Sequence, residues 1–436
     1  MKEIKTVSIV GANGTMGFSV GGIFASFGNC KVYMVARKKE AAEKSVLSAA
    51  ATVKAESVSK RLIAKTYEDF KEIIPESDLV FESVAEDLSI KKEINNMIAK
   101  YIREDAIVAT GTSGLSVTEL SESFKGGVKA RYTGTHFFNP PYQLTLCEVI
   151  PTIHTDKAWL GEYKEYLSKV LRRAVVEIKD APGFLGNRIG FQLMNEVLQF
   201  AEINKDKGGI DYMDAILGSF SGRAMPPIAT VNFVGLDVHK AIVDNLYDKT
   251  DDYAHDTFVL PGFVQEQINK GELGMKTGAG LYKTLKNEDG SRTRQVYDIA
   301  TKSFRNLGKY DFPFVKKMNN ALRISDYKCA FDSLINDDSD EAKLCLTFIL
   351  KFVLYSLVTA DAVAEKPGDA DICMVTGYNW APPIGIIVAL GGADKVKELM
   401  KEYIPAEWLN KVDINKLIHD GLKPEYDYRR YFRSGR

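Results

Sequence analysis

The chain reads T-V-S-I-V-G-A-N-G-T-M-G from Thr6 to Gly17. The first five residues are rich in β-branched apolar side chains and predict a buried strand. Three glycines follow, then a helix-like segment at 18–27 and a second apolar run at 31–36. A strand, a glycine loop, a helix and a strand in this order predict an α/β fold, the start of a Rossmann-type doubly wound sheet.

The glycine loop predicts a dinucleotide site, because glycine lets the backbone approach a pyrophosphate and the helix N-terminus offers N–H groups to it. The alternative is a tight strand–helix turn without a ligand. The loop residues predicted to contact the cofactor are Gly11, Asn13, Gly14, Thr15, Met16 and Gly17.

The residues at the end of the second strand do not decide between NAD(H) and NADP(H). The glycine spacing is G-x-x-G-x-x-G, one residue longer than the usual form, and Ala36-Arg37 stands where an NAD site normally has an acid for the ribose 2′-hydroxyl. Arg37 would suit a 2′-phosphate instead. We therefore keep both NAD(H) and NADP(H).

Three further strands of the first domain are predicted at 78–84, 106–110 and 174–178, and residues 39–65 are predicted to be helical. Polar residues follow two of these strands: Glu86 after the first and Ser113 after the second. In an open parallel sheet such strand ends face the ligand.

The stretch Y-T-G-T-H-F-F-N-P-P-Y-Q-L-T-L-C-E-V-I, residues 132–150, predicts two strands joined by a proline turn. His136 and Glu148 are lone titratable groups in these apolar strands. A carboxylate that folds back onto an imidazole fixes its tautomer and stabilises the imidazolium, which suits a general base. The alternative is a histidine held by a backbone carbonyl.

The sequence predicts four segments along the chain. The Rossmann-type sheet (1–181) ends at a Pro-Gly joint and is followed by a first all-α domain (182–283), a polar linker (284–294) and a second all-α domain (295–436). The second helical domain resembles a copy of the first, with Asp371 before Pro382-Pro383 as Asp214 stands before Pro226-Pro227. Such a repeat can cover a surface that would otherwise meet a second subunit, so we expect a monomer or a homodimer.

The bulk composition excludes several classes of protein. The chain has 436 residues, 45% of them hydrophobic, and a net charge of −1, so no overall field attracts nucleic acid or an anionic membrane. The five cysteines lack C-x-x-C spacing and predict reduced core residues, with no metal site. The first residues lead directly into a strand, so we expect a cytoplasmic protein without a signal peptide.

Seven motifs follow one another along the chain: G-x-x-G-x-M-G, F-E-S-V-A-E-D-L-S-I-K, T-S-G-L, T-H-F-F-N-P-P, C-E-V-I, P-G-F-L-G-N-R and G-M-K-T-G-A-G-L-Y. In this order they resemble the L-3-hydroxyacyl-CoA dehydrogenase family. The resemblance implies interconversion of a (3S)-3-hydroxyacyl-CoA and a 3-oxoacyl-CoA with a nicotinamide cofactor. The sequence of this chain departs from the family motif N-T-S-S at Gly111-Thr112-Ser113-Gly114.

The resemblance also implies roles for individual residues. His136 would be the general base and Glu148 the carboxylate that orients it, while Ser113 and Asn187 would contact the substrate oxygen. The positions that match cofactor contacts are Glu86, Lys91, Ser113 and Asn139.

Two other functions remain as alternatives. One is a dehydrogenase of the same fold that acts on a free hydroxy acid or a carnitine-like alcohol. The other is a catalytically silent nucleotide-binding or structural protein.

Overall fold

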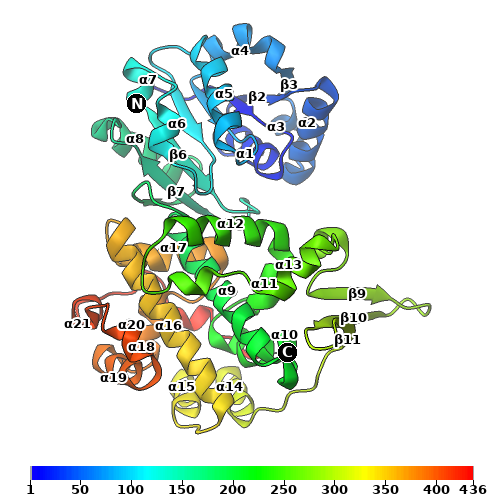
Figure 1. The fold of residues 1–436 in the computed structure, drawn as a ribbon. Helices are drawn as coiled ribbons and strands as arrows, with labels where there is room; N and C mark the ends of the chain where they lie inside the picture. Colours follow the sequence, from blue (N-terminus) through cyan, green and yellow to red (C-terminus); the bar gives the residue numbers. More distant parts are fainter. Residues whose placement is uncertain (1, 436) are drawn as a thin grey trace. The chain divides into compact units, whose positions relative to one another are not determined.

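A computed structural model describes residues 2–435 as two compact units (Figure 1). The first unit runs to Phe184 and includes residues 363–365, and the second comprises 185–362 and 366–436. The division falls beside Pro182-Gly183. Both predicted helical domains lie in the second unit.

The first unit is built on an eight-stranded sheet in the order β3-β2-β1-β4-β5-β6-β7-β8. All pairings are parallel except β6 with β7. The strands are β1 (Thr6–Val10), β2 (Lys31–Ala36), β3 (Leu62–Thr66), β4 (Leu79–Glu82), β5 (Ile107–Thr110), β6 (Tyr132–Phe137), β7 (Leu146–Pro151) and β8 (Ala174–Glu177). The predicted doubly wound fold is confirmed.

Helices connect most of these strands, and the central strands of the sheet are buried. The helices are α1 (Thr15–Ser26), α2 (Lys39–Val53), α3 (Glu56–Ser59), α4 (Phe70–Glu76), α5 (Leu88–Ala99), α6 (Val117–Ser121), α7 (Gly126–Ala130) and α8 (Lys157–Lys169). Val7, Ile9, Val32 and Met34 are fully buried in one core. Burial from both sides explains why β1 and β2 read as nearly continuous apolar runs.

The prediction of helix throughout 39–65 is wrong at its C-terminal end. Helix α2 ends at Val53, and its C-cap Lys54 adopts a left-handed backbone conformation with φ 54°. Leu62–Thr66 then forms β3 at the edge of the sheet, parallel to β2. Pairing with β2 decides this conformation, because tertiary contacts override the local helix propensity of an Ala- and Lys-rich segment.

The second unit is largely helical. Its helices are α9 (Gly186–Ile203), α10 (Ile210–Ile216), α11 (Pro227–Val234), α12 (Leu236–Lys249), α13 (Gly262–Asn269), α14 (Pro313–Arg323), α15 (Tyr327–Ile335), α16 (Asp340–Val363), α17 (Gly368–Tyr378), α18 (Pro383–Ala389), α19 (Ala393–Tyr403), α20 (Ala406–Leu409) and α21 (Ile414–Leu417). Among the described residues, α16 alone has the length and composition to cross a membrane, and 78% of its apolar window is buried inside the protein. Burial of this kind is typical of a core helix.

The two helical copies share a capping motif. Asp214 accepts hydrogen bonds from Ile228 N and Ala229 N, both at 2.9 Å, at the start of α11. Asp371 accepts one from Ile384 N at 2.8 Å, at the start of α18. Each carboxylate therefore caps a helix that begins with the second proline of a Pro-Pro pair, which supports the repeat inferred from the sequence.

The prediction of a linker at 284–294 needs correction. Strand β9 (Tyr282–Lys286) pairs with β10 (Arg292–Asp298), and β11 (Ser303–Asn306) completes an antiparallel sheet in the second unit (Figure 1). The turn between β9 and β10 contains Gly290 with φ 81°. These strands are mostly polar and few of their residues are buried, so the sequence lacks the apolar alternation that normally marks a strand.

Candidate active site

The polar residues predicted at strand ends gather at one edge of the first unit's sheet. Strands β1, β4, β5 and β6 are parallel, so the segments that follow them emerge at the same edge. The glycine loop follows β1, Glu86 follows β4, Ser113 follows β5, and His136 lies near the end of β6. This carboxyl edge is where open α/β sheets bind ligands.

The three glycines of the loop differ in whether the fold itself requires a glycine at that position. A Cβ at Gly11, where φ is 88°, would lie 2.5 Å from Ser83 O, and a Cβ at Gly17 would lie 2.4 Å from Gly11 O. At Gly14 the nearest atom of the chain is Gly11 O, at 3.7 Å. Packing within the protein therefore requires Gly11 and Gly17 but not Gly14, which fits an approach of a ligand to the backbone there.

The start of α1 is suited to an anion. Gly14 is its N-cap, no side chain of the described residues caps it, and its first turn contains no acidic residue. No acidic side chain of this first turn therefore neutralises its backbone N–H groups and the positive end of the helix dipole. These features fit the pyrophosphate of a dinucleotide.

His136 and Glu148 face each other across the antiparallel pair β6–β7. The His136 Nδ1 atom lies 2.7 Å from Glu148 Oε2, and the two residues are 5% and 0% exposed. A carboxylate accepts hydrogen bonds only, so Nδ1 carries the proton and donates it. Nε2 is then the ring nitrogen with a lone pair, as a general base requires.

Two aromatic rings enclose the imidazole. Phe138 lies edge-on to it at a centroid distance of 4.7 Å, and Phe184 lies at 5.5 Å. Phe184 follows Gly183, and both have positive φ, 56° and 67°. A left-handed phenylalanine is rare and costs free energy, so the surrounding structure must hold this residue in place beside the imidazole.

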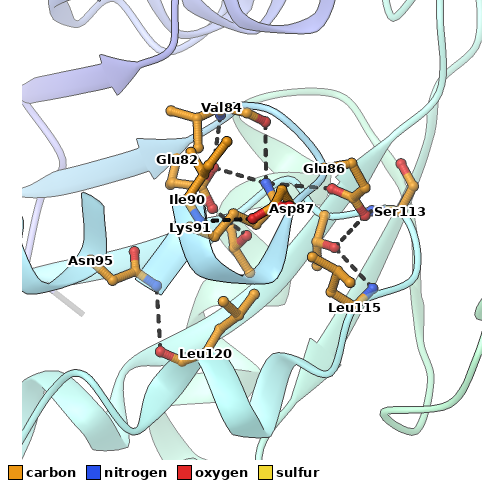
Figure 2. A network of polar contacts seen from close by, with 12 residues as sticks. Glu82, Val84, Glu86, Asp87, Ile90, Lys91, Asn95, Ser113, Leu115 and Leu120 are labelled. Atoms are coloured by element: carbon orange, nitrogen blue, oxygen red, sulfur yellow. Dashed lines mark hydrogen bonds and ion pairs between the residues drawn. The ribbon is translucent and has the colours of Figure 1, made fainter. Parts of the chain in front are cut away.

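A buried ion-pair network lies at the end of β4 (Figure 2). Lys91 Nζ donates to Glu82 Oε1 at 2.9 Å and lies 3.4 Å from Glu86 Oε2. Glu82 also accepts from Thr110 Oγ1 at 2.7 Å and from Val84 N at 2.7 Å. The side chains of Lys91 and Glu82 are 1% and 0% exposed, so each charge depends on the other.

Glu86 connects this network to the segment that carries Ser113. Its Oε1 accepts hydrogen bonds from Thr112 Oγ1 at 2.6 Å and from Ser113 N at 2.7 Å (Figure 2). Ser113 contributes its backbone N–H to this network and not its hydroxyl. The network therefore fixes the backbone at Ser113 and leaves the side chain for another partner.

The other predicted site residues have separate positions. Arg37 is exposed directly after β2, and Asn139 is exposed two residues after the end of β6. Lys91, predicted from the family to meet the cofactor, is buried against Glu82 and Glu86. Asn187 belongs to the second unit, in the first turn of α9, where it is 6% exposed.

Comparisons with known proteins agree with this arrangement. Residues 6–181 match the family model described as "3-hydroxyacyl-CoA dehydrogenase, NAD binding domain", and residues 183–284 match "3-hydroxyacyl-CoA dehydrogenase, C-terminal domain". The chain is 32% identical to a 3-hydroxybutyryl-CoA dehydrogenase of Clostridioides difficile over 63% of this chain and 98% of that protein. The chain belongs to the 3-hydroxyacyl-CoA dehydrogenase family.

Two further relatives show how much of the chain is similar to known proteins. A probable 3-hydroxyacyl-CoA dehydrogenase of Bacillus subtilis is 31% identical over 76% of this chain, but the chain spans only 41% of that protein's length. The crystal structure of 3-hydroxybutyryl-CoA dehydrogenase from Escherichia coli K12 covers 93% of this chain and 96% of its own, with a TM-score of 0.65 and 20% identity. The latter shows that the fold extends through the second helical copy.

Sequence reasoning missed two residues of this candidate site. Glu82 was visible as a carboxylate inside an apolar strand, nine positions before Lys91, and that pattern is a usable signal for a buried pair. Phe184 gave no signal, because a left-handed conformation cannot be read from a phenylalanine. Burial raises the pKa of the Cys147 thiol, next to Glu148, well above the ordinary value, which disfavours the thiolate form.

We expect Gly14→Ala to separate ligand binding from folding. Because the added methyl group meets no close atom of the chain, the unfolding free energy should change by no more than about 1 kcal/mol. It should weaken binding of the reduced dinucleotide roughly tenfold or more, since it blocks the approach of the pyrophosphate. Isothermal titration calorimetry measures this, with Gly17→Ala as the variant that should instead disturb the fold. Unchanged affinity in Gly14→Ala would contradict the assignment of the loop.

Proposed function

We propose that this chain interconverts (3S)-3-hydroxyacyl-CoA and 3-oxoacyl-CoA by hydride exchange with a nicotinamide cofactor. The observation that carries the proposal is the buried His136–Glu148 pair at the same edge of the sheet as the glycine loop. An oriented, desolvated imidazole is the group needed to move the proton of an alcohol. Membership of the family supports the substrate class.

The proton is handled by His136. In the oxidative direction Nε2 accepts it from the 3-hydroxyl group, and in the reductive direction the imidazolium returns it. Glu148 holds Nδ1–H and stabilises the positive charge that the ring acquires. The aromatic enclosure limits access of water to the ring and strengthens this interaction.

Ser113 and Asn187 are proposed to donate hydrogen bonds to the substrate oxygen, as the family resemblance implies. Donors that are fixed before the reaction stabilise developing charge without reorganising. The anchoring of the Ser113 backbone by Glu86 supports this role for Ser113.

The cofactor is proposed to lie over Gly11–Gly17, with Gly14 and the N-terminus of α1 at its pyrophosphate. When bound, it supplies the acceptor for the hydride that leaves the alcohol carbon. Glu86 and Asn139 are proposed to contact it, and Lys91 to act by positioning Glu86.

The experiment that tests this function compares initial rates on a set of 3-oxoacyl-CoAs, on free acetoacetate and on a carnitine-like ketone, with NADH and NADPH. We expect turnover of short 3-oxoacyl-CoAs and little turnover of the free acid. Preference for the free acid or a carnitine-like ketone would replace the substrate class. Binding of cofactor without any turnover would indicate a silent protein.

Arg37 offers a test of cofactor choice. It is exposed directly after β2, and Ala36-Arg37 stands where an NAD site normally has an acid for the ribose hydroxyl. We expect Arg37→Ala to weaken NADPH binding by roughly tenfold, because a guanidinium pairs with a 2′-phosphate, and to leave NADH binding within about twofold. Calorimetric titrations check this, with Lys39→Ala as the control for an exposed cation nearby. An equal effect on both cofactors would show that Arg37 does not read the 2′-phosphate.

The proposal includes a cytoplasmic location and a monomeric or homodimeric state. An antiparallel bridge between Arg223 and Trp380 joins the loops before α11 and α18, so the two copies pair within one chain. This pairing supports a second copy that covers a surface otherwise met by another subunit.

A further inference from the structure

The second helical copy contacts a residue of the proposed site. Tyr378 is the last residue of α17, and its hydroxyl donates a hydrogen bond to Asn187 Oδ1 at 3.0 Å. The two residues are 191 positions apart in the chain. Because Asn187 is 6% exposed, this hydrogen bond lies in a largely dry environment, where it has a strong effect on orientation.

The position of the tyrosine ring is set by its packing. Gly190, one turn after Asn187 on α9, makes room for it: a Cβ there would lie 2.5 Å from Tyr378 Cζ. Trp380 packs against the same ring at a centroid distance of 4.9 Å. Helix α17 ends immediately after the tyrosine, since Asn379 is left-handed with φ 55°. The hydroxyl is therefore held at Asn187 by the fold of both copies.

A side-chain amide can present either its oxygen or its NH2 group to a ligand. A phenol that donates to Oδ1 holds the oxygen in place and directs Nδ2, a donor, elsewhere. An oxygen that gains negative charge during hydride transfer needs a donor and is repelled by a carbonyl oxygen. An amide that is fixed with its NH2 group toward the substrate oxygen therefore favours the reaction.

We propose that Tyr378 of the second helical copy is a positioning residue for Asn187, holding its amide so that the NH2 group is the one offered to the substrate oxygen. This inference rests on the proposed function, because it takes Asn187 to contact that oxygen. It gives the second copy a catalytic contribution, although that copy has no counterpart of His136 or Glu148.

The test replaces only the hydroxyl. We expect Tyr378→Phe to lower kcat about tenfold, which corresponds to one lost hydrogen bond of functional consequence. The KM for the acyl-CoA and the thermal midpoint should stay near wild-type values, because the ring and its packing on Gly190 remain. In an Asn187→Ala background, Tyr378→Phe should cause no further loss, since the amide through which it acts is gone.

A matched control is Tyr212→Phe. The hydroxyl of Tyr212 also joins the two copies, donating to Glu341 Oε1 at 2.7 Å, but it does not contact Asn187. Tyr212→Phe should therefore lower the stability of the protein and leave kcat unchanged. Equal loss of kcat on adding Tyr378→Phe to wild type and to Asn187→Ala would assign Tyr378 a structural role and overturn the inference. So would full activity of Tyr378→Phe when Asn187→Ala is slow, whereas absence of turnover in the wild type would remove the proposed function itself.

Discussion

His136→Gln is expected to lower kcat for reduction of a 3-oxoacyl-CoA by roughly 100- to 10,000-fold, the usual contribution of a positioned acid or base. Glutamine has similar volume and can still donate a hydrogen bond to Glu148, so the carboxylate does not become a buried unpaired charge. The fold and the affinity for the dinucleotide should therefore survive. Steady-state kinetics, with calorimetry of cofactor binding, measures both.

The chain contains a matched control for this variant. His154 in the same unit also pairs with a carboxylate, its Nε2 lying 3.0 Å from Glu122 Oε1, but its side chain is 34% exposed. We expect His154→Gln to leave kcat within about twofold, since an exposed pair contributes little. Similar losses in the two variants, or full activity of His136→Gln, would remove His136 as the base.

Lys91→Met is expected to destabilise the first unit by roughly 3 to 5 kcal/mol, because it strands the carboxylate of Glu82 in a fully buried position. The variant should also lower activity, since Glu86 loses its cation beside the segment that carries Ser113. Equilibrium urea unfolding, with the transitions of the two units resolved, measures the stability.

Lys92→Met tests whether burial of the ion pair is the reason for the large loss of stability expected for Lys91→Met. Lys92 is the next residue of α5 and pairs with Glu119 at 2.6 Å, but the two side chains are 38% and 48% exposed. Its loss should cost about 0 to 1 kcal/mol. Adding Glu82→Gln to Lys91→Met should recover part of the stability, because it removes the stranded charge. Equal destabilisation by Lys91→Met and Lys92→Met would contradict this view of the network.

The sequence was sufficient for those features that local patterns encode. The apolar runs and the glycine loop gave the doubly wound sheet, and the two strands around a proline turn predicted that His136 and Glu148 would meet, as the structure shows. In an antiparallel pair, facing residues follow from the length of the turn and the register of the strands.

Features that depend on distant partners could not be predicted. Strand β3 forms because β2 is there to pair with it, and β9 and β10 have no apolar alternation. The role of Glu82 requires the burial of Lys91 and Thr110 around it. The contact of Tyr378 with Asn187 joins two helical copies, and no periodicity in either copy encodes it.

The most direct measurement is a single turnover with enzyme in excess. The wild-type protein is mixed with a reduced nicotinamide dinucleotide and then with acetoacetyl-CoA, while the absorbance of the reduced cofactor is followed. We expect the bound cofactor to be oxidised completely and rapidly, because His136, held by Glu148, donates the proton that the reaction needs. Cofactor that binds but stays reduced in the presence of the acyl-CoA would contradict it.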